Sequence, residues 1–127
     1  MSLRHKISTL WIVVMFNMAF ADILSFISPD FLTQAAAGTI DGVTITPMFI
    51  LVAAIFVEVG IAMIFLTQVL RLKLARIANL VAVVITILFV VGGGSLAPHY
   101  IFFAVVEILA MLYIARLAWT WTETSVE

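Results

Sequence analysis

Four long apolar runs restrict this chain to one broad class of fold. They cover approximately residues 7–28, 46–69, 73–92 and 98–121. Each has about 20 residues or more, the length at which an α-helix crosses the roughly 30 Å hydrocarbon core of a bilayer. Lipid offers the backbone no hydrogen bonds, so such runs must form helices. We therefore predict an all-α, integral membrane four-helix bundle, with residues 1–127 as a single transmembrane domain.

Composition agrees with this class and excludes several functions. Hydrophobic residues make up 65% of the chain and charged residues only 10%, whereas soluble domains carry about 25% charged residues. The absence of cysteine excludes disulfides, thiolate catalysis and cysteine-based metal or iron–sulfur sites. The net charge of -1 argues against a nucleic-acid partner. Both histidines lie at the edges of apolar runs, so haem ligation across the bundle is not expected, and the sequence leaves the cofactor unknown.

The positions of the basic residues predict how the chain is oriented. Two short connections, 70–72 and 93–97, and one longer polar connection, 29–45, join the four runs. If the runs alternate in direction, every Lys and Arg falls on the same side of the membrane: Arg4, Lys6, Arg71, Lys73, Arg76 and Arg116. Basic residues collect in cytoplasmic loops. We therefore predict an N-in/C-in arrangement with both termini in the cytoplasm.

Three carboxylates lie inside the predicted spans: Asp22, Glu58 and Glu107. Acidic groups at membrane depth cost about 2.5 to 3.5 kcal/mol each on insertion scales, so they are expected to face a bundle interior or water. No Lys or Arg is predicted at this depth, so ordinary ion pairs cannot neutralise all three. These acids are the most informative residues of the sequence.

The acids can be placed at similar depths in the outer half of the membrane. Counting inward from the predicted outer boundary, Asp22 lies about 10 Å deep, Glu107 about 14 Å, Asn17 about 16 Å and Glu58 about 18 Å. Tyr100 lies on the same stripe of the fourth run as Glu107. These five residues form the predicted ligand- or ion-binding site, which includes no metal.

The third run adds two polar residues to this picture. Thr86 lies near the depth of the acids, and Asn79 lies closer to the cytoplasmic end. The alternative to a functional cavity is that each acid is a neutral hydrogen-bonding pin that sets the register between helices. Three acids at one depth favour the cavity.

Several segments resemble a small bacterial family of four-span membrane proteins without an assigned function. The resemblance is carried by residues 17–24 (NMAFADIL), 57–63 (VEVGIAM) and 100–108, which include Asp22, Glu58 and Glu107. More distantly, a glutamate in the second span followed by a glycine and a basic turn is similar to the DoxX-like group. This resemblance implies a bacterial inner membrane and, for some DoxX-like members, redox or quinone-linked systems. The chain has no cysteine pair, so thiol redox chemistry is not implied.

Three functions remain open from the sequence. The first is a membrane protein whose acidic cavity binds or passes a small amphipathic molecule, a cation or a proton. The second is an accessory or scaffold subunit of a membrane complex, for which homo-oligomerisation is expected. The third is an intramembrane enzyme acting on a quinone- or isoprenoid-like substrate, with one carboxyl group as acid and another as base. No sequence motif specifies a reaction.

Overall fold

A computed structural model of the chain describes residues 2–40, 43–92 and 97–121. It contains four long helices, α1 (Leu3–Ile27), α3 (Pro47–Val69), α4 (Leu72–Gly92) and α5 (Pro98–Trp119). All four are long and apolar enough to cross a membrane, which confirms the prediction of an all-α, multi-pass membrane protein. The largest difference in bounds is at α1, which begins earlier than predicted because the Ser2 hydroxyl caps it, accepting a hydrogen bond from the His5 amide at 3.2 Å.

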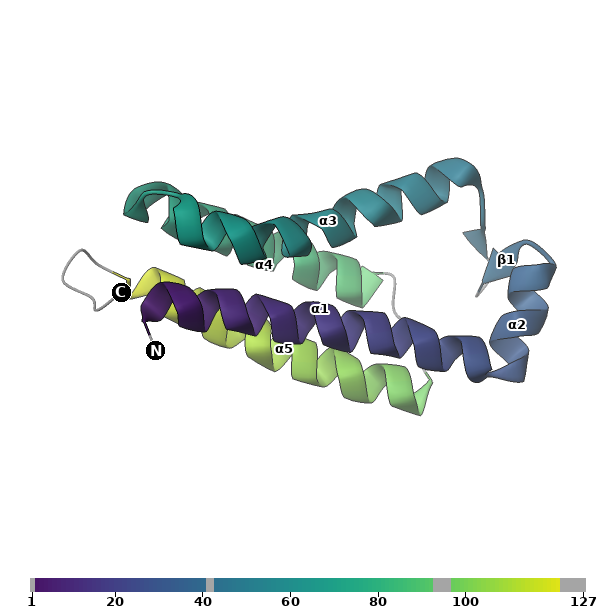
Figure 1. The fold of residues 1–127 in the computed structure, drawn as a ribbon. Coiled ribbons are helices and arrows are strands. Elements are labelled where there is room, and N and C mark those ends of the chain that lie inside the picture. The colour runs from purple at the N-terminus through teal and green to yellow at the C-terminus, as the bar shows by residue number, and fades with distance from the viewer. Residues whose placement is uncertain (1, 41–42, 93–96, 122–127) are drawn as a thin grey trace.

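The four long helices form a closed ring in which each packs on two neighbours. Helix α1 packs on α3 and α5, and α4 packs on the same two helices. The ends of the described chain and the α3–α4 turn lie at one end of the bundle, and the α1–α3 connection lies at the other (Figure 1). All six basic residues belong to the first of these ends. We call it the basic end, and we call the opposite end the hairpin end.

The described residues of the long connection between α1 and α3 form a short helix and two short strands, which its polar sequence did not predict. It contains α2 (Pro29–Ala36) and an antiparallel pair of short strands, β1 (Thr39–Ile40) and β2 (Val43–Thr44). Pro29 begins α2, where its missing N–H is tolerated. Gly38, with a φ of 84°, makes the left-handed turn from α2 into β1. No residue of α2 is buried, and its eight residues are too short a stretch for apolar spacing to have identified it.

Helix α3 buries residues along only half of its length. Its buried residues, Gly60, Met63 and Thr67, all lie in the half nearer the basic end. The preceding half, from Pro47 to Val59, has no buried residue, and Figure 1 shows it diverging from α1 toward the hairpin end. This divergence opens a space between the two helices, which is the starting point for the candidate site.

Candidate ligand-binding site

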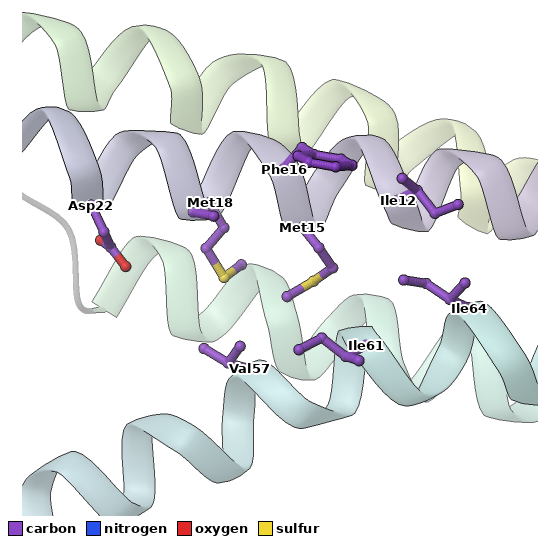
Figure 2. Close-up of a pocket in the computed structure, with 9 residues that line it drawn as sticks. Ile12, Met15, Phe16, Met18, Asp22, Val57, Ile61 and Ile64 are labelled. Atoms are coloured by element: carbon purple, nitrogen blue, oxygen red, sulfur yellow. The ribbon is translucent and has the colours of Figure 1, made fainter.

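A groove of about 390 Å³ lies between α1 and α3. Most of its lining is apolar, and it consists of Ile12, Met15, Phe16, Met18, Ala19, Asp22, Val57, Ile61 and Ile64. Figure 2 shows the side chains of α1 facing those of α3, with the two helices separating from Ile64 toward Asp22. The groove is therefore narrow near the basic end and wide toward the hairpin end.

Gly60 sets the narrow part of the groove. A Cβ atom at this position would collide with Sδ of Met15 and would contact the ring of Trp11. The missing side chain thus lets α1 and α3 approach closely at this level. Beyond it α3 carries larger side chains such as Val57, and the helices separate. A single glycine therefore marks the point where helix packing ends and the groove begins.

Asp22 is the one ionisable residue that lines the groove. Its side chain is exposed, and it lies where the helices are farthest apart (Figure 2). The six basic residues are at the other end of the bundle, and Arg4 is 18 residues earlier on the same helix, which corresponds to about 27 Å. The groove therefore has apolar walls and one carboxyl group. None of these six basic residues is close enough to form an ion pair with it.

Glu107 lies in the bundle interior next to this groove. Its side chain is 2% exposed, and its Oε1 atom is buried without a hydrogen-bond partner in the described part of the chain. Asp22 lies close enough to Glu107 for the two carboxyl groups to interact electrostatically, and Tyr100 lies close enough to interact with both. The structure thus brings together Asp22, Tyr100 and Glu107, three of the five predicted site residues.

The other two predicted residues do not join this cluster. Glu58 is exposed on the half of α3 that diverges from the bundle, and it is not part of the groove lining. Asn17 is half-buried, and its side-chain amide donates to the Val13 carbonyl of its own helix at 2.7 Å. Glu58 and Asn17 therefore have different surroundings from Asp22, Tyr100 and Glu107.

Thr86 is a second polar group sealed in the interior. It is 1% exposed, and its hydroxyl oxygen is also buried without a partner among the described residues. Helices α4 and α5 are held in register by a hydrogen bond from Arg76 Nε to the Ala118 carbonyl at 3.0 Å. Thr86 lies 10 residues after Arg76, and Glu107 lies 11 residues before Ala118. Because the helices are antiparallel, Thr86 and Glu107 lie within about one helical turn, roughly 5 Å, of the same level.

A fully bonded polar network lies nearer the basic end, and the sequence pointed to it only through Asn79. Trp11 Nε1 donates to Asn79 Oδ1 at 2.7 Å, and Asn79 Nδ2 donates to the Ala75 carbonyl at 2.8 Å. Thr67 completes the network with weaker contacts to Asn79 at 3.3 and 3.4 Å. These residues join α1, α3 and α4 and close the narrow end of the groove. We call Trp11, Thr67 and Asn79 the closing network.

A family model described as a family of unknown function (DUF6326) matches residues 2–127. The search of curated proteins gives no match, and neither does the search of solved structures. The resemblance to the DoxX-like group stays a prediction.

Proposed function

The chain belongs to the DUF6326 family of unknown function. Since the family assigns no activity, the proposal starts from the groove: we propose that the protein binds a small amphipathic cation between α1 and α3. The apolar part of the ligand would lie along Met15, Phe16 and Ile61, and its charged group would lie beside Asp22. The observation that carries this proposal is a groove of about 390 Å³ with a single carboxyl group at its wide end.

The charge at Asp22 would supply the selectivity. Lipid tails are as apolar as the groove walls, so a ligand moving from the bilayer into the groove gains little from apolar contact. Two opposite charges about 4 Å apart attract by about 4 kcal/mol at an effective dielectric constant of about 20. Part of this energy is offset by removing both charges from water. The remainder is enough to favour a cation over a neutral molecule of the same shape.

The test compares binding of decyltrimethylammonium with binding of neutral decanol, using protein in lipid nanodiscs and empty nanodiscs as background. For Asp22→Asn we expect the affinity for the cation to fall about 10-fold or more, a loss of about 1.4 kcal/mol. The affinity for decanol should not change. Glu58→Gln is the matched control, since it also replaces a carboxyl group by its amide but at a residue outside the groove lining. Equal cation binding by Asp22→Asn and wild type would rule out the proposal.

Gly60→Ala tests the shape of the groove separately from its charge. The added methyl group would displace the end of the Met15 side chain, which lines the groove. Methionine is flexible, so we expect the free energy of unfolding to change by less than about 1 kcal/mol. Affinity for decyltrimethylammonium should fall by about 3-fold to 10-fold, a loss of about 0.7 to 1.4 kcal/mol. A large loss of stability with unchanged affinity would show that the glycine serves packing alone.

The accessory or scaffold function is the second candidate, and the surface of α3 supports it. The diverging half of α3 has no buried residue and carries the exposed Glu58 within a predicted span. A carboxylate facing lipid costs about 2.5 to 3.5 kcal/mol on insertion scales, so covering this face with a second copy of the chain would be favourable. Native mass spectrometry gives the copy number. A dimer that is lost in Glu58→Leu but retained in Asp22→Asn would favour this function.

We also propose that the protein lies in a bacterial inner membrane with both termini in the cytoplasm. The support is the collection of all six basic residues at the basic end. Because the natural chain has no cysteine, a single introduced cysteine reports one position. In intact cells, a membrane-impermeant maleimide should label Thr33→Cys, and it should label Ser2→Cys only after permeabilisation. The reverse pattern would invert the proposed orientation.

A further inference from the structure

Glu107 has an environment that an ionised carboxyl group does not tolerate alone. Its side chain is 98% buried, and its Oε1 atom has no donor among the described residues. An unpaired carboxylate in such a place carries a large desolvation cost, which a bound proton removes. Thr86, at a similar level, offers only a hydroxyl group, and that hydroxyl is itself unpartnered. The described arrangement therefore favours the protonated form of Glu107 over the carboxylate.

Few titratable groups face Glu107 from the helices around it. From α1 the group is Asp22, and on α5 itself it is Tyr100. Helix α4 presents Thr86, which does not titrate, and the one acid of α3, Glu58, is exposed on the diverging half. The proton on Glu107 is therefore controlled mainly by the charge at Asp22 and by whatever binds beside it.

We propose that the groove exchanges a cation for the proton of Glu107. This inference rests on the proposed function, because the cation is the amphipathic ligand held beside Asp22. Before binding, the pair of an ionised Asp22 and a protonated Glu107 carries one negative charge. After binding, two carboxylates and one cation also carry one negative charge in total. The O–H bond of Glu107 breaks heterolytically and the proton passes to water, with no oxidation and no covalent bond to the ligand.

The exchange keeps the net charge of the membrane interior constant, which is its physical advantage. A cation near Asp22 attracts the carboxylate form of Glu107 and so lowers the cost of ionising it. By thermodynamic reciprocity, protonation of Glu107 must weaken cation binding by the same factor. Binding should therefore release protons, and it should become weaker as the pH falls.

Calorimetry counts the released protons directly. Decyltrimethylammonium is titrated into wild type in two buffers of different ionisation enthalpy at the same pH, and the difference in heat gives the protons released per cation bound. We expect a value above zero and up to about one, with affinity falling by up to about 10-fold per pH unit on acidification. Glu107→Gln should release no proton and lose this pH dependence, whereas Glu58→Gln should behave as wild type.

The outcomes separate this inference from the function on which it rests. Cation binding by wild type without proton release, and with affinity independent of pH, would overturn the exchange and leave the groove proposal standing. Undiminished proton release in Glu107→Gln would also overturn it. No specific cation binding by wild type would defeat the proposed function and the exchange together. If Glu107→Gln does not fold, wild type still tests the exchange, because binding with no proton released and no pH dependence would overturn it.

Discussion

Asn79→Leu should lower the free energy of unfolding by about 2 to 4 kcal/mol. Asn79 is fully buried and accepts the hydrogen bond of Trp11 Nε1 at 2.7 Å. Leucine has a similar size but no polar atoms, so the substitution leaves the Trp11 donor and the Thr67 hydroxyl buried without this partner. Each such orphaned group costs about 1 to 3 kcal/mol. The change is measured by reversible unfolding in mixed micelles, with the helix content monitored by circular dichroism.

Thr86→Val is the matched control for that experiment. Thr86 lies on the same helix, seven residues from Asn79, and is equally buried, but its hydroxyl has no partner among the described residues. Valine has nearly the same shape, so removal of the hydroxyl should leave stability unchanged or raise it by about 1 kcal/mol. If both substitutions lowered the free energy of unfolding by similar amounts, the distinction between a hydrogen-bonded and an unbonded buried polar group would be wrong.

This contrast divides the interior into two regions with different roles. At the narrow end of the groove the closing network satisfies its polar groups and joins α1, α3 and α4. Toward the hairpin end, Glu107 and Thr86 are buried with unpartnered oxygens, and the third such atom among the described residues, Trp121 Nε1, lies apart from them at the basic end. Natural interiors rarely leave such groups unbonded, so each exception calls for an explanation. The unsatisfied region also lies beside the groove, which is why we place the proton exchange there.

The helices could be predicted from the sequence because the length of an apolar run alone determines a membrane span. The directions in which the acidic side chains point could not be predicted. In a soluble helix the apolar stripe marks the buried face, but in a bilayer the lipid-facing side is apolar as well. Helix α3 is apolar all around, so nothing in its sequence showed that Glu58 would lie on the exposed surface. The depth of an acidic residue could be estimated by counting residues along its helix. The direction in which its side chain points depends on how the helices pack.

The groove itself had no sequence signal for the same reason. Its lining combines ordinary apolar residues of α1 and α3, and only the divergence of these helices makes them a site. Gly60 appeared in the sequence as part of a family resemblance, but its role depends on Met15, which lies on another helix. The connection after α1 was missed because α2 buries no residue and each strand has only two residues.

Arg4→Met should lower the free energy of unfolding by about 1 to 3 kcal/mol. Arg4 Nη1 donates to the carbonyls of Thr67 at 2.9 Å and Leu70 at 2.6 Å, which belong to the end of α3. The last carbonyls of a helix have no partner within it, so the guanidinium satisfies them and also favours the negative end of the helix dipole. Its carbon atom Cζ also lies 4.9 Å from the ring centre of Trp121. Methionine keeps the apolar stem of the side chain and loses all of these interactions.

Lys6→Met is the control, since it removes one positive charge from the same end of α1 and so affects membrane orientation equally. We expect it to change stability by less than about 0.5 kcal/mol, as for most surface substitutions. Arg4→Lys should fall between the two, because an ammonium group keeps the charge and the hydrogen-bond donors but loses the planar guanidinium that lies over Trp121. Since Arg4 holds α1 against the packed half of α3, Arg4→Met should also weaken decyltrimethylammonium binding in the groove, whereas Lys6→Met should not. Equal stability losses for Arg4→Met and Lys6→Met would mean that charge, rather than these contacts, stabilises the basic end.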